Sequence, residues 1–195
     1  MVELIVSLAI MGVIFTVILL NQSSYNEAAG LTALADDVAA RVSESQAYGI
    51  AVKELSPGSS DFSASYGVSI STIASGANLV YLVFADRNAN GIYDGLRACA
   101  TGGANECLER TDITRGNYVD SLCIIKNNGT DDCSAPKRAD ITFVRPDPSA
   151  HITVFNSSGS TYTPGNMAGV RYVFKSPSGL SRSVSVYFNG QVSVQ

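Results

Sequence analysis

The sequence predicts an α+β fold in which a long N-terminal α-helix packs on an antiparallel β-sheet head domain. Three observations predict this fold. The first is an apolar run over residues 4–20 that contains no charge and no proline, and the second is a stripe of apolar residues at helical spacing that follows it. The third is a series of β-branched and aromatic stretches separated by turn residues. We expect the first half of the helix to span a membrane and the second half to be amphipathic.

The apolar run is preceded by a single charge, Glu3. At about 1.5 Å per residue, residues 4–20 form a helix roughly 25 Å long, near the short end of what a bilayer requires. A signal peptide is not expected, because basic residues before the run and a small-x-small cleavage site after it are both missing. Two alternatives are left, an ordinary membrane anchor and a helix that waits in the membrane and later packs against copies of itself. Glu3 favours the second, because a carboxylate at the edge of an apolar helix needs a partner.

Residues 2–6, Val-Glu-Leu-Ile-Val, are followed by an apolar helix that contains Gly12. This pattern closely resembles the N-terminal signature of type IV pilins and of the pseudopilins of type II secretion. The resemblance implies cleavage by a prepilin peptidase, methylation of the new amine, and pairing of Glu3 with the N-terminus, here Met1, of a neighbouring subunit. It also implies that an inner-membrane assembly machinery builds a helical homo-oligomeric filament at the cell surface after a membrane-inserted state.

The chain departs from this family pattern in two places. The customary glycine and aromatic residue ahead of the glutamate are missing, and so is a proline late in the apolar helix. Any unwinding of the helix would therefore depend on Gly12 or on the polar residues 21–24.

The second half of the helix is predicted from apolar residues at spacings of three and four with charged residues between them. These apolar residues are Leu31, Leu34, Ala35, Val38, Ala39 and Val42. We expect the helix to end between residues 52 and 55, because residues 56–60 form a helix-breaking Ser-Pro-Gly-Ser-Ser cluster. The predicted domains are a pilin helix at 1–55, with the hydrophobic assembly or membrane segment at 1–24, and a globular β-rich head at 56–195.

The head is predicted to be an antiparallel sheet. Its expected strands lie at 66–70, 79–84, 141–144, 152–155, 170–174 and 183–188. Asn189-Gly190 signals a last tight hairpin that ends in residues 191–194. This order of helix, sheet and closing hairpin is similar to the head domains of the GspH and FimT group of minor pilins and pseudopilins.

A loop follows the predicted strand that ends at Phe84. It has side-chain oxygens at alternate positions, a glycine for a sharp turn and a backbone carbonyl, which are the components of the first half of an EF-hand calcium loop. The candidate calcium ligands are Asp86, Asn88, Asn90, the carbonyl of Ile92 and Asp94. The alternative is a hairpin loop whose Asp and Asn side chains form Asx-turns. Similar loops occur in the GspH-like group, often without metal, so we expect no required cofactor beyond this candidate calcium.

Four cysteines, Cys99, Cys107, Cys123 and Cys133, lie in a glycine-, asparagine- and aspartate-rich region. An even number of cysteines in an exported domain predicts disulfides. Three connectivities are possible, and the two local pairs would close polar loops. A zinc site is disfavoured, because there is no CxxC pair and the only histidine, His151, is distant in sequence.

Composition and motifs argue against other functions. With one histidine and no HExxH, GxSxG or phosphate-binding glycine loop, we expect no enzyme. A net charge of -4 argues against broad nucleic-acid affinity. Some FimT-like minor pilins bind DNA through basic residues near the C-terminus, and Arg182 fits that pattern, whereas residues 191–195 supply no basic tail. Three tripeptides match the N-glycosylation sequon, beginning at Asn21, Asn128 and Asn156.

The expected function is that of a structural subunit of a type IV pilus or pilus-like extracellular filament, assembled through its hydrophobic N-terminal helix and supporting adhesion or motility. The alternative within the family is a minor pilin or a GspH-like pseudopilin of type II secretion. The alternative of a different class is a membrane-anchored extracytoplasmic binding module or enzyme, in which Glu3 would be dispensable.

Overall fold

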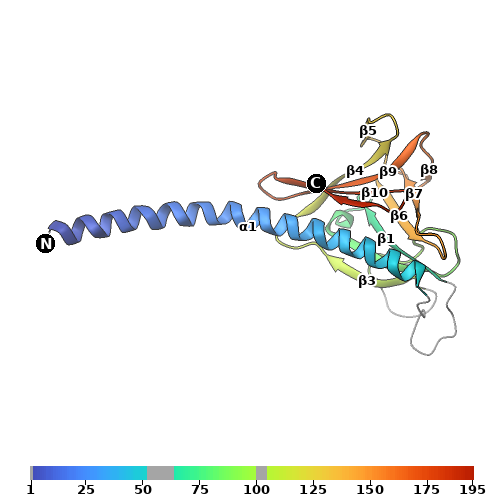
Figure 1. Ribbon diagram of the computed structural model, residues 1–195, viewed down its shortest axis with the longest axis horizontal. Coiled ribbons are helices and arrows are strands. Elements are labelled where there is room, and N and C mark those ends of the chain that lie inside the picture. The colour runs from blue at the N-terminus through green and yellow to red at the C-terminus, as the bar shows by residue number, and fades with distance from the viewer. Residues whose placement is uncertain (1, 52–63, 100–104) are drawn as a thin grey trace, which may run out of the picture.

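The computed structural model describes residues 2–51, 64–99 and 105–195, and within the helix the side chains at 19–21 and 23 are not described. A long helix, α1, projects from a β-rich head (Figure 1). Met1 and the expected helix end at 52–55 lie outside the described residues.

Helix α1 runs from Val2 to Ile50. The prediction that its first half spans a membrane is wrong for this structure, because none of the helices in residues 2–51, 64–99 and 105–195 is both long and apolar enough for a membrane crossing. The physical reason is length, since the run over residues 4–20 covers about 25 Å and a hydrocarbon core is about 30 Å thick.

The second half of α1 packs on the head with the stripe that the sequence predicted. Leu31, Ala35, Val38 and Val42 are fully buried, and Leu34 and Ala39 pack against them at the edge of the core. The stripe ends at Gly49, where an added Cβ would lie 2.6 Å from the carbonyl oxygen of Phe143. Only glycine allows the end of the helix to approach the sheet this closely.

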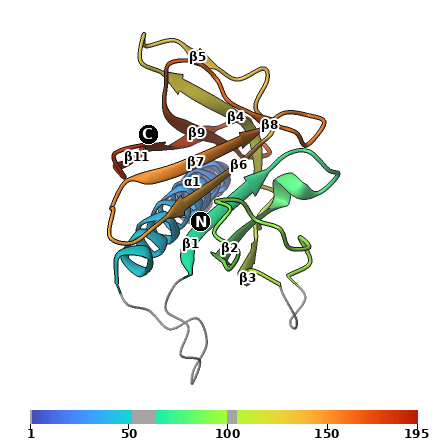
Figure 2. The same cartoon turned by 90° about the vertical axis from the view of Figure 1, so that its right-hand side faces the viewer.

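The head contains two antiparallel sheets, so the prediction of one sheet under a long membrane helix is wrong and the fold is mostly β (Figure 2). The first sheet has the order β3-β2-β1-β6-β7-β8. Its strands are β1 (Ser65–Ser71), β2 (Val80–Asp86), β3 (Cys107–Asp112), β6 (Arg138–Phe143), β7 (Ala150–Phe155) and β8 (Thr161–Tyr162), and a short 3-10 helix, η1 (Ala77–Leu79), precedes β2.

The second sheet has the order β11-β10-β9-β4-β5. Its strands are β4 (Tyr118–Lys126), β5 (Asp131–Asp132), β9 (Met167–Lys175), β10 (Ser181–Tyr187) and β11 (Val192–Val194). Helix α1 contacts β1 and β6 of the first sheet and β10 and β11 of the second, so its apolar stripe closes the core between the sheets. Every residue of β1 and β2 is buried, as expected for strands covered on both faces.

Candidate functional site

The first half of α1 exposes a large apolar surface. It extends from the head without contact to either sheet (Figure 1). Twelve large apolar side chains between residues 2 and 18 are 50% to 74% exposed, and they point in all directions around the helix. They are Val2, Leu4, Ile5, Val6, Leu8, Ile10, Met11, Val13, Ile14, Phe15, Val17 and Ile18. A helix that is apolar all round is normally buried, and exposed apolar surface of this size marks an interaction site.

The polar residues of this segment are satisfied within the helix. The Ser7 hydroxyl donates to the carbonyl of Glu3 at 2.9 Å, and the Thr16 hydroxyl donates to the carbonyl of Gly12 at 2.8 Å. The Glu3 side chain is exposed at the tip of the helix. A Cβ at Gly12 would meet nothing within 4 Å, so no contact inside the subunit requires a glycine there.

A polar cluster fastens the other half of α1 to the first sheet. The Tyr81 hydroxyl of β2 donates a hydrogen bond to the Asp37 carboxylate. Arg41 donates to Glu44 at 3.0 Å and to Glu109 of β3 at 3.0 Å. Burial of Tyr81, together with the hydrogen bond to Asp37, raises the pKa of its phenol to about 12. The helix is therefore held to the head by charge and hydrogen bonding as well as by its apolar stripe.

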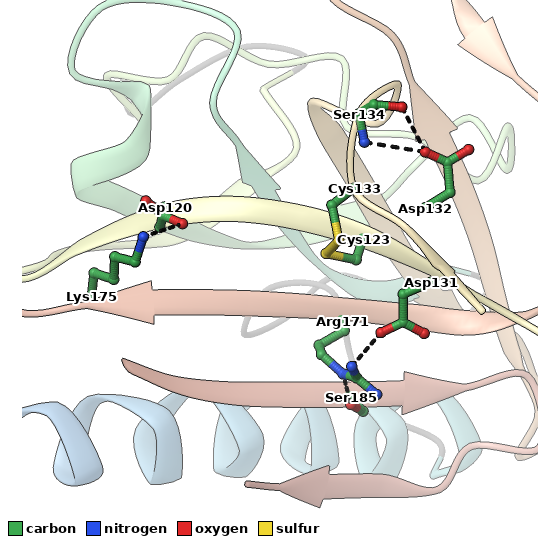
Figure 3. The surroundings of a disulfide bond; sticks show 9 residues. All are labelled: Asp120, Cys123, Asp131, Asp132, Cys133, Ser134, Arg171, Lys175 and Ser185. Atoms are coloured by element: carbon green, nitrogen blue, oxygen red, sulfur yellow. Dashed lines mark hydrogen bonds and ion pairs between the residues drawn. A yellow bond between two sulfur atoms is a disulfide. The ribbon is translucent and has the colours of Figure 1, made fainter. Parts of the chain in front are cut away.

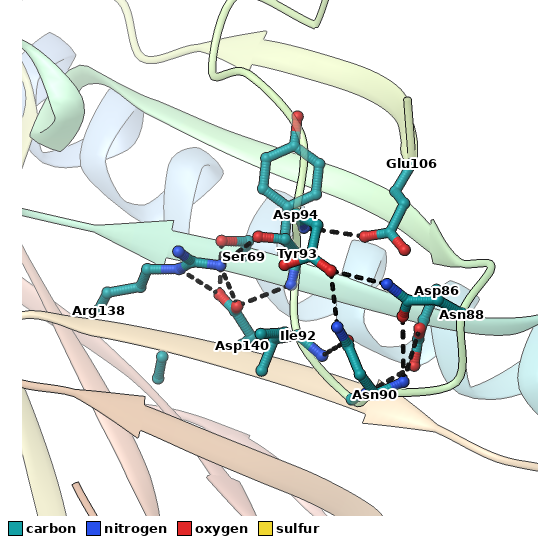
Figure 4. Close-up of polar contacts among 12 residues, drawn as sticks. Ser69, Asp86, Asn88, Asn90, Ile92, Tyr93, Asp94, Glu106, Arg138 and Asp140 are labelled. Atoms are coloured by element: carbon teal, nitrogen blue, oxygen red, sulfur yellow. Dashed lines mark hydrogen bonds and ion pairs between the residues drawn. The ribbon is translucent and has the colours of Figure 1, made fainter. Parts of the chain in front are cut away.

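The loop after β2 folds around the Asp86 carboxylate, which is 2% exposed (Figure 4). This carboxylate accepts hydrogen bonds from the backbone N–H groups of Asn90 at 3.1 Å and Gly91 at 2.8 Å. Gly91 has a φ of 76°, the left-handed conformation that favours glycine. The carboxylate of a candidate calcium ligand therefore closes the loop itself.

The other candidate ligands form Asx-turns. Asn88 Oδ1 accepts the N–H of Asn90 at 3.2 Å, and Asn90 Oδ1 accepts the N–H of Ile92 at 2.9 Å. The amide nitrogens of Asn88 and Asn90 both donate to Asp94 Oδ2, at 2.8 and 2.6 Å. The structure thus brings the predicted ligands together in the hydrogen-bonding pattern of the alternative, the Asx-turn loop.

Calcium would have to replace these bonds, because two N–H donors now face the Asp94 oxygen that it would bind. Among the described residues, no group of three or more His, Cys, Asp or Glu side chains is placed to hold a metal ion. These contacts do not test calcium binding, and they are the contacts that the Asx-turn alternative requires.

The ion pair of Asp140 and Arg138 on β6 holds the loop after β2 against the sheet. The Asp140 carboxylate on β6 is fully buried and accepts the Ser69 hydroxyl at 2.6 Å, the Tyr93 N–H at 2.9 Å and the guanidinium of Arg138. Arg138 also donates to the Tyr93 carbonyl at 2.6 Å and lies 4.3 Å from the ring centroid of Phe155. These contacts satisfy the buried charges and fix the loop on the sheet.

Glu106 closes the loop from the β3 side. Its carboxylate accepts the backbone N–H of Arg87 at 3.1 Å and of Asp94 at 2.9 Å (Figure 4). Burial, with a smaller effect of Asp86 and Asp94, raises the pKa of the Glu106 carboxyl. Glu106, Asp140 and Arg138 were not predicted as supports of this loop, because only the tertiary fold brings β6, which carries Arg138 and Asp140, and the residue just before β3 to the loop. The polar positions 138 and 140 in an otherwise buried strand were the available signal.

Both local disulfides are present in the structure. Cys99 is bonded to Cys107 beside the loop, and Cys123 is bonded to Cys133 (Figure 3). The second bond joins β4 to the segment after β5, whose short hairpin pairs over only two residues of each strand. The disulfide therefore holds a hairpin with little apolar support.

The basic residues of the second sheet are largely paired with acids. Arg171 pairs with Asp131, and Lys175 pairs with Asp120 at 3.0 Å (Figure 3). Lys126 lies 3.6 Å from Asp132. Nucleic-acid binding needs cations that can release phosphate counterions, so these pairs weaken the argument for DNA capture by this face.

The chain was compared with protein families, characterised proteins and solved structures, and none of them matches it. The resemblance to pilins therefore depends on the N-terminal residues and the order of elements. The pilus, adhesion and secretion roles that the resemblance implies gain no support from similar proteins. The transmembrane helix that it also implies is contradicted, because no helix of the described residues is long and apolar enough to cross a membrane.

Proposed function

We propose that this protein is a structural subunit of a helical, pilus-like filament that assembles by packing of the N-terminal helices of many copies. The observation that carries the proposal is the projecting apolar half of α1, with twelve large side chains at least half exposed. The head domain buries its own core, whereas the apolar side chains of this helix segment are left exposed in the described part of the chain.

The apolar segment can supply the free energy of assembly. Full burial of a large apolar side chain contributes about 1.5–3 kcal/mol, so completing the burial of twelve half-exposed ones contributes on the order of 10 kcal/mol or more per subunit. Association costs about 4–15 kcal/mol of lost freedom. One helix pair would therefore be marginal, whereas a bundle in which each helix contacts several neighbours is favourable.

The packed half of α1 offers a continuation of this surface. A series of its exposed residues lies opposite the buried stripe and recurs at alternating spacings of four and three, which is the period of helix packing. The series is Ala29, Ala33, Asp36, Ala40, Ser43, Ala47 and Ile50. Small side chains permit close approach of a second helix. Asp36, the charged residue of this series, would need a polar partner in the assembly, whereas the neighbouring exposed Asp37 already accepts the Tyr81 hydroxyl.

Glu3 would have to be paired in such a bundle. It is the only charged residue between positions 2 and 18, and burial of an unpaired carboxylate among apolar helices is costly. The terminal amine of a neighbouring subunit is the partner that the family resemblance implies. The pairing would set the axial register of one helix against the next.

The test is cryo-electron microscopy of material sheared from the surface of cells that produce the protein, with Leu8→Glu compared with Leu180→Glu. Leu8 lies on the projecting helix, and Leu180 is an exposed leucine of the head. We expect filaments whose density follows this chain in the wild type and in Leu180→Glu. Leu8→Glu should lose them, because a buried carboxylate costs several kcal/mol per subunit.

Other outcomes are informative. Filaments built mainly from another protein, with this chain present at low copy number, would favour the alternative of a minor pilin or GspH-like pseudopilin. A wild-type chain that stays monomeric in analytical ultracentrifugation and never enters the sheared fraction would refute assembly through α1. Equal filament yield from Leu8→Glu and Leu180→Glu would refute the role of the apolar helix.

A further inference from the structure

We propose that Asn128 is an N-glycosylation site of this protein, modified from a lipid-diphosphate-linked saccharide. Asn128-Gly129-Thr130 is one of the three sequons in the chain. The proposal concerns a face of the head that plays no part in the helix packing proposed above, so it can be tested separately.

The acceptor asparagine is presented at the tip of an exposed turn. Residues 127–130, between β4 and β5, are all exposed, and Gly129 closes the turn by donating its N–H to the carbonyl of Lys126 at 3.0 Å. A Cβ at Gly129 would meet nothing within 4 Å, so the space around the turn is open. In Figures 1 and 2 the hairpin of β4 and β5 lies at the top of the head, away from α1.

The carboxamide is oriented by the residue that completes the sequon. Asn128 Oδ1 accepts the N–H of Thr130 at 3.2 Å and the hydroxyl of Thr130 at 2.7 Å. Among the described residues, Nδ2 of Asn128 has no hydrogen-bond partner. The nitrogen that would form the glycosidic bond therefore belongs to an exposed residue and has no competing hydrogen bond there, while the side-chain carbonyl oxygen accepts two hydrogen bonds.

The turn sits on a rigid stem. The Cys123–Cys133 disulfide joins the two sides of the hairpin, and Asp131 is paired with Arg171 of β9 (Figure 3). Two disulfides, with no free cysteine among the described residues, are typical of chains that fold in an oxidising compartment. N-glycosylation marks surface loops of secreted proteins.

The sequon at Asn156 provides an internal comparison. Its side chain is half-buried, and Oδ1 accepts three bonds, from the N–H and hydroxyl of Ser158 and from the N–H of Ser160 at 3.1 Å. The Asn156 N–H also donates to the carbonyl of Ser160 at 3.0 Å. A transferase would have to open this turn, so the structure favours Asn128 over Asn156.

The reaction is a redox-neutral group transfer. Asn128 Nδ2 forms a bond to the anomeric carbon of the saccharide, and the bond from that carbon to the diphosphate oxygen of the lipid carrier breaks. The lipid diphosphate leaves with the electron pair, and one amide proton is released. The catalyst is an oligosaccharyltransferase of the producing cell, which the hydroxyl at the third sequon position would engage.

The test is peptide mass spectrometry of the full-length protein purified from the cells that produce it, with and without amidase deglycosylation. We expect a saccharide on the peptide that contains Asn128 and conversion of Asn128 to aspartate by the amidase. Thr130→Ala should lose the modification and Thr130→Ser should keep it, since only the hydroxyl is required. Asn156→Gln should leave the glycosylated fraction unchanged.

Two results would overturn the proposal. The first is an unmodified Asn128 peptide in the native protein. The second is a modified fraction that survives Thr130→Ala or lies mainly at Asn156. Filament formation by Asn128→Gln, read in the same sheared fraction, separates this proposal from the assembly function, because loss of the glycan should leave assembly intact.

Discussion

The contact between Tyr81 and Asp37 allows a prediction for the attachment of α1 to the head. Tyr81→Phe removes the hydroxyl that donates to the Asp37 carboxylate and leaves the buried ring in place. A hydrogen bond to a charged group contributes about 1.5–3 kcal/mol. We therefore expect the variant to lose about 2 kcal/mol of free energy of unfolding at neutral pH.

The pKa of Tyr81 gives this loss a distinctive pH dependence. Burial and the bond to Asp37 raise this pKa from 10.0 to about 12. The unfolded chain releases the phenol proton near pH 10 and the folded chain retains it, so the stabilisation is complete below pH 10 and is lost as the pH rises toward 12. Two pKa units correspond to about 2.7 kcal/mol, which solvent access to the hydroxyl reduces to roughly 1.5 kcal/mol.

The assay is urea denaturation followed by circular dichroism, at neutral pH and at steps between pH 10 and 12. The stability difference between wild type and Tyr81→Phe should shrink over that range. Tyr25→Phe is the control, because Tyr25 is an exposed tyrosine of α1, the helix that carries Asp37, and its substitution should change nothing. A difference that stays constant with pH, or that is missing at neutral pH, would refute the coupling of Tyr81 to Asp37.

Three further predictions concern the head domain. Asp140→Ala should lower the free energy of unfolding by about 3–5 kcal/mol, because it leaves the mostly buried charge of Arg138 without its carboxylate partner. A loss below about 1 kcal/mol in urea denaturation would contradict this prediction. Replacing Cys123 and Cys133 by serine should cost about 3 kcal/mol, the chain-entropy value for a loop of this length, and an unchanged denaturation midpoint would show that the hairpin holds without its disulfide. The midpoint of thermal unfolding should be the same in calcium as in a chelator, since the side-chain oxygens of the loop after β2 already accept hydrogen bonds. A rise of the midpoint in calcium that Asn88→Ala abolishes would instead establish a calcium site.

Local patterns predicted the elements well where one face of the element is buried. The stripe from Leu31 to Val42 appears in the sequence at the spacing of a helix, and the structure buries it as expected. The expected strands all correspond to strands of the structure, because alternation and β-branched runs are local signals. Helix α1 is assigned as far as Ile50, and the expected helix end at 52–55 lies outside the described residues.

The arrangement of the strands could not be read in the same way. β4 pairs with β9, about fifty residues later in the chain, and turn signals connect only neighbouring strands. Nothing in the sequence of β1 or β2, which are buried on both faces, indicates which partner each takes. The division into two sheets is therefore a property of long-range packing. The same holds for the loop after β2, whose support Asp140 comes from β6, a strand that is distant in sequence.

The distribution of polar contacts bears on how the protein would assemble. The head neutralises the buried charge of Asp140 internally with Arg138, pairs Asp131 with Arg171 at its surface, and fixes its exposed hairpin with a disulfide. Residues 2–18 of α1, whose side chains are all described, form no ion pair or disulfide, and their hydroxyl groups bond within the helix. In a bundle of such helices the heads would lie outside, with the hairpin of β4 and β5 on the side of each head away from α1.

A glycan at Asn128 would then cover the outer surface of a filament without entering the contact between subunits. This arrangement makes a joint prediction. Leu8→Glu should abolish filaments while leaving Asn128 modified, and Asn128→Gln should remove the glycan while leaving filaments. A glycan required for assembly would place the hairpin of β4 and β5 in the contact between subunits, and the packing of helices could then no longer be the sole interface.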